Sequence, residues 1–317
     1  MEIVRVTGGA LEALAQEAAA HATKSKSART LVEYEKQWTV FGDWCRKRAR
    51  LALPAEAATL ALYVTERARD VGLSSLGQAL SAITYYHDRA RLPSPRHDPL
   101  VKDVLNGIAR GKGSAKNKKD ALTLVKLQRI LPVLSGDTAI RDRALLLVGY
   151  SAALRRNEIV STRVEHFTRD ELGRGYVLNV VRSKTDQRGE GRIKAIPFNF
   201  RNRLLCPASA LEDWLSVSGI VSGPVFRGIQ NCAITSDKLW GDDVARIVKR
   251  WSQRAGIENW QNLSGHSLRA GFITDARRNR SSWAEITKQT GQTEKTAEGY
   301  VRQEEIWTDN AVVELFR

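Results

Sequence analysis

Cysteine is scarce in this chain of 317 residues, and none of its three cysteines forms a CxxC pair. Cys45, Cys206 and Cys232 are too few and too dispersed for a disulfide framework or a zinc site. The five histidines also lack the HExxH or HxH spacing that places two metal ligands on one face. They are His21, His87, His97, His166 and His266. We therefore expect no structural metal.

Long apolar runs are also missing. No stretch approaches the roughly 20 apolar residues that a membrane span requires. The N-terminus lacks the basic segment followed by an apolar one that is typical of a signal peptide. We expect a cytoplasmic, nucleoid-associated protein with no membrane partner.

Acidic residues are outnumbered, because 35 of them stand against 50 lysines and arginines, for a formal net charge of +15. Residues 1–120 alone hold 20 basic and 13 acidic residues, so both parts of the chain are net positive. This balance indicates a polyanionic partner, with nucleic acid as the first candidate and an anionic membrane surface as the second. A hydrophobic fraction of 42% over this length excludes a disordered protein.

The first hundred residues carry apolar side chains at helical spacing, without the alternation typical of strands. Leu31, Tyr34, Trp38, Phe41 and Trp44 recur every three or four positions and form one apolar helix face. Further helices are predicted from Pro54 onward, through 76–86 and over 100–108, with an additional helix at 10–22. We predict a helical DNA-binding domain of four or five helices over residues 1–109.

Residues 110–120, RGKGSAKNKKD, contain almost no apolar side chain and predict a basic linker. Its lysines are Lys112, Lys116, Lys118 and Lys119. A run of like charges is commonly a solvated connector. A basic linker between two basic lobes also suits DNA binding, with the lobes holding a duplex from opposite sides. Both interpretations of these lysines are open.

Residues 121–317 predict a second, mainly helical domain with a small sheet. The β-prone residues over 176–181 and 193–198 flank a polar, glycine-containing turn and predict a hairpin. Helices are expected over about 207–217, 240–255, 267–280, 282–290 and 308–316.

Three motifs in this second domain contain residues suited to chemistry. In SGHSLRAGF, His266 and Arg269 stand three apart, which places both on one helix face. Alone, an HxxR pattern is more often an ordinary surface pair. In ALRRNEIVS, Arg155 stands at a predicted helix start and Glu158 follows one turn later. Tyr300, in EGYVR, follows the HxxR motif by about thirty residues.

In order and spacing, the three motifs together resemble the signature of the tyrosine recombinase (phage integrase) family, and the surrounding segments resemble Cre-like simple recombinases. The resemblance extends over the whole chain, because the family has a helical, SAM-like core-binding domain ahead of its catalytic domain. It implies a two-domain, C-shaped DNA clamp that is mainly α, with a small β-sheet in the catalytic domain. It also implies a site-specific recombinase that needs no metal or other cofactor.

By the same resemblance, the enzyme cleaves and rejoins double-stranded DNA through a 3′-phosphotyrosyl intermediate, as a homotetramer on two inverted-repeat sites. The chemistry of the residues agrees. A tyrosine phenol forms an ester close in energy to a phosphodiester, so Tyr300 is the expected nucleophile. The forked guanidinium groups of Arg155 and Arg269 suit the negative charge that gathers on the phosphate oxygens. His266 titrates near neutral pH, so it is suited to hydrogen-bond the phosphate or to assist proton transfer.

The departing 5′ oxygen needs a general acid, and the resemblance implies a lysine in the hairpin turn. Lys184, in SKTD, is the first candidate and Lys194, in the second strand, is its rival. The alternative interpretation of Lys184 is a polar turn residue. The resemblance gives Glu158 the task of orienting the site, whereas its local interpretation is an i,i+3 partner of Arg155 that stabilises the helix.

One position departs from the family pattern. Gln292, eight residues before Tyr300, stands where the family usually has histidine or tryptophan. A glutamine amide still donates to a phosphate oxygen, which would preserve the function with weaker transition-state binding. Alternatively, Gln292 is an ordinary polar residue after the helix that ends near Gly291.

The C-terminal segment 308–317 predicts a short helix beginning after Thr308. This helix either packs on its own protomer or, as the resemblance implies, docks on the neighbouring protomer of the tetramer. Two other functions remain as alternatives: a DNA-binding architectural or regulatory protein with little or no cleavage, and a strand-transfer enzyme similar to a type IB topoisomerase.

Overall fold

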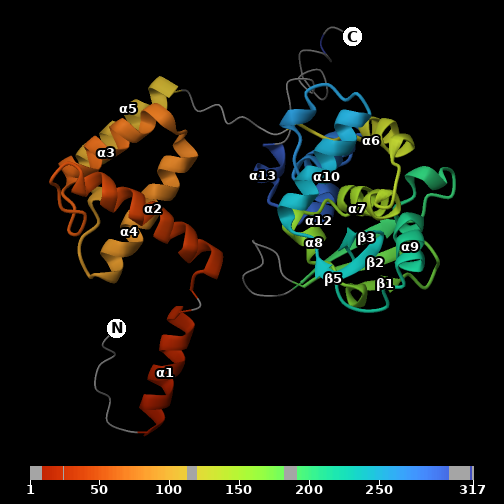
Figure 1. The fold of residues 1–317 in the computed structure, drawn as a ribbon, viewed down its shortest axis with the longest axis horizontal. Coiled ribbons are helices and arrows are strands. Elements are labelled where there is room, and N and C mark those ends of the chain that lie inside the picture. Colours follow the sequence, from red (N-terminus) through yellow and green to blue (C-terminus); the bar gives the residue numbers. More distant parts are fainter. Residues whose placement is uncertain (1–8, 24, 113–119, 182–190, 300–314, 316–317) are drawn as a thin grey trace. The chain divides into compact units, whose positions relative to one another are not determined.

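The computed structural model describes residues 9–23, 25–112, 120–181, 191–299 and 315, and the chain divides into two compact units (Figure 1). The N-terminal unit spans Met1–Lys116 and the C-terminal unit spans Asn117–Arg317. Helices dominate both units, and the strands form small antiparallel sheets in the C-terminal unit. The predicted class, mainly α with a small sheet, is confirmed.

In its described residues, the N-terminal unit has five α-helices. They are α1 (Gly9–Thr23), α2 (Ala28–Arg46), α3 (Ala57–Asp70), α4 (Leu73–Arg89) and α5 (Pro99–Lys112). Helix α2 packs on α4, and α3 packs on α5. The predicted apolar face of α2 contributes Phe41, which is fully buried together with Leu60, Val64 and Ile83. Burial of these side chains holds the helices together.

A fully buried histidine ties the start of α3 to α4. The backbone N–H of Ala55 donates to Nε2 of His87 over 3.0 Å. Nδ1 therefore carries the proton and donates to the carbonyl oxygen of Ile83 over 2.8 Å. The helix predicted from Pro54 begins instead at Ala57, because Glu56 before it is extended, with φ −76° and ψ 153°.

The predicted linker also begins later than expected. Residues 110–112 form the last turn of α5, where the positive charges of Arg110 and Lys112 favour the helix C-terminus. Lys112 Nζ donates to the carbonyl oxygen of Val71 over 2.9 Å, which holds this turn against the end of α3. The other predicted linker lysines, Lys116, Lys118 and Lys119, lie outside the described residues.

The C-terminal unit contains the predicted hairpin and the predicted helices, apart from the segment 308–316, of which only Leu315 is described. Its α-helices are α6 (Leu124–Ile130), α7 (Ala139–Ser151), α8 (Arg156–Val160), α9 (Pro207–Ser218), α10 (Gly241–Arg254), α11 (Ser267–Arg278), α12 (Trp283–Thr290) and α13 (Glu294–Glu298). The helices α6, α7 and α13 were not predicted.

The main sheet has the antiparallel order β1–β2–β3, with β1 (Phe167–Arg169), β2 (Gly175–Val180) and β3 (Arg192–Pro197). The pairing of β2 with β3 is the predicted hairpin, and it places Leu178 opposite Lys194. Lys194 and Ile196 are both buried, because alternate residues of a strand share one face. A second hairpin, β4 (Arg227–Gln230) with β5 (Ala233–Lys238), was not predicted.

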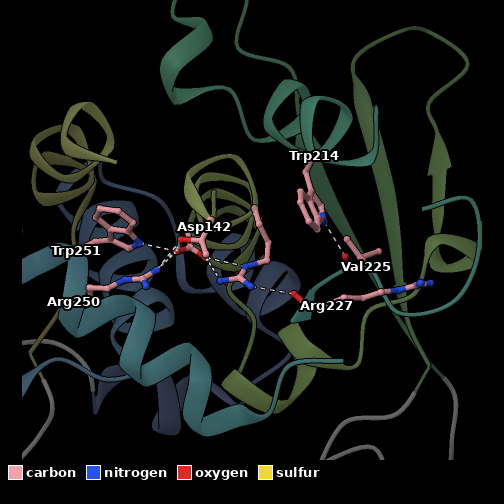
Figure 2. A network of polar contacts seen from close by, with 8 residues as sticks. Asp142, Trp214, Val225, Arg227, Arg250 and Trp251 are labelled. Carbon is pink, nitrogen blue, oxygen red and sulfur yellow. Dashed lines mark hydrogen bonds and ion pairs between the residues drawn. The ribbon is translucent and has the colours of Figure 1, made fainter. Parts of the chain in front are cut away.

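Helix α7 lies at the centre of this unit, and its residues 144–148 are at most 2% exposed. Near its start, the fully buried Asp142 accepts hydrogen bonds from Arg141 (2.8 Å), Trp251 Nε1 (2.7 Å) and Arg250 (Figure 2). A carboxylate without water needs such donors, because an unpaired buried charge is strongly destabilising. The network joins α7 to α10 and thereby fixes the scaffold on which the site is built.

Candidate active site

A tight turn after α7 places Arg155 at the start of α8. The Leu154 N–H bonds the Gly149 carbonyl (2.9 Å) and the Ala153 N–H bonds the Tyr150 carbonyl (3.0 Å), which is the Schellman pattern of a helix end. Ala153 has φ +48° at the position of this turn that favours glycine. The chain then extends at Arg155, the residue that caps α8.

Glu158 holds both the backbone and the side chain of Arg155. One carboxylate oxygen of Glu158 accepts the backbone N–H of Arg155 over 2.9 Å, and the other accepts from Arg155 Nη1 over 2.6 Å. Glu158 is only 8% exposed, and hydrogen bonds between charged groups are the strong ones. The carboxylate therefore caps the helix and orients the guanidinium at once, which combines the two interpretations of this residue.

Helix α11 carries the HxxR pair at its start. His266 is the residue before its first turn, and Arg269 lies one turn further at 1% exposure. Arg269 Nη1 donates to the Ala153 carbonyl over 2.6 Å, and Nη2 donates to the Thr290 carbonyl over 2.7 Å. The guanidinium thus joins the turn before Arg155 to the end of α12.

Two glycines allow α10 and α11 to approach α8 closely. A Cβ on Gly265 would lie 2.6 Å from the Arg156 Cβ, and one on Gly241 would collide with the side chain of Asn157. Asp242, next to Gly241, accepts a hydrogen bond from Arg156 over 2.7 Å. These contacts bring the start of α11, with His266, against the start of α8, with Arg155.

His266 is exposed and lies near the cationic side chains of Arg155, Arg156 and Arg269. Partial loss of water around the ring is the largest cause that lowers its pKa below the ordinary 6.5. Arg156, Arg155 and Arg269 lower the pKa further, and Glu158 opposes them. The neutral imidazole, with one nitrogen able to accept a proton, is the favoured form at pH 7.

Lys194, the rival candidate for the general acid, is 2% exposed. Its Nζ donates to the carbonyl oxygens of Ala152 (2.9 Å) and Gln289 (2.6 Å). Burial is the largest cause that lowers its pKa to about 7, followed by the charge of Arg269. Lys194 therefore lies beside the arginines of the site, but its ammonium group bonds the protein backbone.

A cavity of about 740 Å³ opens beside Arg155, and Arg192, Gly291, Gln292 and Thr296 are among the residues that line it. The Gln292 N–H donates to Thr290 Oγ1 over 3.3 Å, while its Oε1 is buried and has no hydrogen-bond partner among the described residues. Arg192 donates to the Gly291 carbonyl. The cavity thus presents two guanidinium groups and one amide, a lining suited to an anion.

The structure brings together Arg155, Glu158, His266 and Arg269, and it places Gln292 on the adjoining cavity. The predicted nucleophile Tyr300 and the predicted general acid Lys184 lie outside the described residues.

Two further residues of this region, Arg192 and Gln289, were missed by the sequence analysis. The signal for Arg192 was the alternation of β3, in which residues 192, 194 and 196 share a face. Gln289 had no sequence signal, because its contacts are to the backbone of distant segments. Within the described ranges, no group of three or more histidine, cysteine or acidic side chains is suited to hold a metal ion. Nor is any helix in these ranges long and apolar enough to cross a bilayer.

Comparison with known proteins gives consistent matches. Residues 120–304 match the model of the phage integrase family. An integrase/recombinase XerD homologue of Selenomonas ruminantium is 31% identical over 313 residues, covering 96% of this chain and 90% of the relative. The recombinase Cre of Escherichia phage P1 is 25% identical over 270 residues, covering 79% of this chain and 76% of the relative.

Solved structures show the same fold. The Tn1549 transposon integrase in complex with transposon right end DNA superposes with a TM-score of 0.60 at 15% identity, covering 92% of this chain and 94% of that one. A lambda integrase dimer bound to a COC′ core site superposes with a TM-score of 0.59 at 14% identity, covering 90% and 93%.

Proposed function

Since the chain belongs to the phage integrase family and is a tyrosine-type site-specific recombinase, we propose that it cleaves and rejoins DNA through a 3′-phosphotyrosyl intermediate on Tyr300. The observation that supports this most is the convergence of Arg155, His266 and Arg269, which come from segments more than a hundred residues apart. Two guanidinium groups and a neutral imidazole in one place suit the transfer of a phosphoryl group to a phenol.

In the proposed cleavage step, the Tyr300 phenol oxygen bonds the scissile phosphorus, and the bond from phosphorus to the 5′ oxygen breaks. The phenol proton passes to neutral His266, and Lys184 gives a proton to the departing 5′ oxygen. Arg155 and Arg269 stabilise the charge on the non-bridging oxygens. Rejoining reverses these steps with a 5′ hydroxyl, so the phosphotyrosine conserves the bond energy and no cofactor is required.

The remaining site residues support this chemistry in the proposal. Glu158 keeps the Arg155 guanidinium in place, and Gln292 donates its amide N–H to a phosphate oxygen at the edge of the cavity. In the proposal Lys184, the first candidate of the hairpin turn, is the general acid, while Lys194 binds two backbone carbonyls.

We also propose the assembly in which this step occurs. The N-terminal unit serves as the core-binding domain and the C-terminal unit as the catalytic domain, and Lys112, Lys116, Lys118 and Lys119 contact DNA phosphates. Protomers bind inverted repeats, and two sites are brought together by a homotetramer in which the segment 308–317 docks on a neighbouring protomer.

Capture of covalent complexes tests the proposal and does not require that the target site be known. The full-length protein is incubated with fragmented host DNA, the mixture is denatured, and the ends of protein-linked fragments are sequenced. We expect adducts that map to an inverted repeat and that are absent with Tyr300→Phe. DNA retained before denaturation but not after it would favour an architectural protein instead. Relaxation of a plasmid carrying the recovered site, without rearranged products, would favour a topoisomerase.

A further inference from the structure

Three cations bind three successive carbonyl oxygens at the C-terminal end of α12. Lys194 binds the oxygen of Gln289 (2.6 Å), Arg269 that of Thr290 (2.7 Å), and Arg192 that of Gly291. The last carbonyls of a helix have no partner within the helix, and the helix dipole places negative charge there. Cations from β3 and α11 therefore satisfy the end of α12, immediately before Gln292.

Two of these cations also bind the two backbone carbonyls that directly follow α7. Lys194 joins Gln289 to Ala152, and Arg269 joins Thr290 to Ala153. The turn that follows Ala153 leads to Arg155. Lys194 and Arg269 thus set the distance between the start of α8 and the end of α12.

The side chain of Gln289 adds hydrogen bonds between the same elements. The contacts that Lys194, Arg269 and Gln289 make between α7, β3 and α12 are called the junction below. Its Nε2 donates to the carbonyl oxygens of Ser151 (2.8 Å) and Ala195 (3.0 Å). Its Oε1 accepts the Ala195 N–H over 3.4 Å. Together, Lys194 and Gln289 connect three elements, α7, β3 and α12, through the backbone of each.

We propose that Lys194 and Gln289 are positioning residues of the strand-transfer reaction, which fix the end of α12 against α7 and β3 and thereby set where the segment after Gly291 presents Tyr300 to Arg155. This inference rests on the proposed function. Neither residue is given contact with DNA, and both act through the backbone that they bind.

The electrostatic environment supports a role beyond stability. Lys194 is buried beside Arg269 and is also near Arg155, Arg192 and the opposing carboxylate of Glu158. Burial, followed by the charge of Arg269, lowers its pKa to about 7. A charged lysine at this position is therefore unfavourable for the folding free energy. An apolar residue of similar size would avoid that cost, as replacements of buried ionic groups show.

The test compares Lys194→Met and Gln289→Met, which retain length and remove the polar atoms, with Lys126→Met as the matched control. Lys126 also donates to a backbone carbonyl, that of Ala121 over 3.0 Å, but outside the junction. Each full-length variant is given a duplex carrying the cleavage site recovered by adduct capture. DNA retention and the rate of adduct formation at saturating DNA are measured separately, together with thermal melting.

We expect both junction variants to form adducts about 100-fold more slowly at saturating DNA, because misplacement of reacting groups is costly. The DNA concentration for half-maximal retention should change by less than about twofold, and Lys126→Met should behave as the wild type. If Lys194→Met fails to fold, Gln289→Met alone decides. Wild-type rates in a folded junction variant, or a parallel loss of retention and cleavage, would overturn the inference. Absence of adducts from the wild type would instead overturn the proposed function.

Discussion

The neutral state of His266 follows from its surroundings and has a measurable consequence. Its pKa is lowered below 6.5, first by the loss of water and then by the nearby arginines. A base that takes the phenol proton must be neutral, so the rate of adduct formation should fall as the pH is lowered, with a midpoint below pH 6.5. Initial rates of adduct formation between about pH 5 and pH 8 measure this decrease. His266→Gln should form adducts more slowly, and its rate should not decrease at low pH. If the decrease persists in that variant, another group is responsible for it.

Lys194 gives a second dependence on pH, in the stability of the fold. Its pKa is about 7 in the fold against 10.5 as the ordinary value. Between these two pH values the unfolded chain holds a proton that the folded state lacks, so stability rises with pH. The melting temperature of the wild type, relative to that of Lys194→Met, should therefore increase between about pH 7 and about pH 9. If the difference between the two melting temperatures does not change with pH, the pKa of Lys194 is not lowered in the fold.

At the residue scale, the sequence predicted side chains that belong to short motifs and missed a side chain that is defined only by its contacts with distant elements. Arg155, Glu158, His266 and Arg269 belong to short motifs with an ordered spacing, and they do lie together. Gln289 bonds the backbones of α7 and β3, 138 and 94 positions away in the chain. No local pattern encodes such contacts, because they depend on how the elements pack.

At the element scale, the segment after the linker is fastened to α11. The Leu122 N–H bonds the Ser267 carbonyl over 2.8 Å, and a Cβ on Gly271 would collide with the Leu122 carbonyl oxygen. Gly271→Ala should therefore push this segment off α11 and destabilise the protein by about 1–3 kcal/mol. Gly107→Ala, in α5, meets nothing within 4 Å and should be neutral or stabilising by up to about 1 kcal/mol. Thermal melting compares them, and equal melting temperatures would contradict the close approach.

Elements with strong periodicity were predicted, and those specified by turns were not. The helices from α9 to α12 have clear apolar faces, and β2–β3 has long β-prone runs. The hairpin β4–β5 turns at Asn231 and Cys232, both of which have positive φ. Such a turn usually carries Asn-Gly, so the Asn-Cys pair concealed the hairpin. Helix α13 is five residues long, too short for helical periodicity to appear.

At the scale of the whole molecule, the linker should contribute to DNA affinity. If Lys116, Lys118 and Lys119 bind phosphates, replacing all three with glutamine should lower the salt slope of DNA binding by about 0.9 for each phosphate that is no longer neutralised. Retention assays over a series of salt concentrations measure the slope. An unchanged slope would identify the lysines as a solvated connector.

The C-terminal segment should separate assembly from binding. Deletion of residues 308–317 should leave DNA retention largely intact and abolish recombination, because the proposed tetramer is held through this segment. A plasmid carrying two recovered sites reports inversion or excision, and gel filtration with DNA reports the assembly. Normal recombination by the truncated protein would show that the segment has no such role.

The central claim is that Tyr300 joins DNA covalently within the site formed by Arg155, His266 and Arg269. The most direct measurement is mass spectrometry of the adduct after nuclease and protease digestion. The account predicts a nucleotide linked through its 3′ phosphate to the peptide that contains Tyr300, in the wild type and not in Tyr300→Phe. A nucleotide on any other residue, or one linked through a 5′ phosphate, would contradict it.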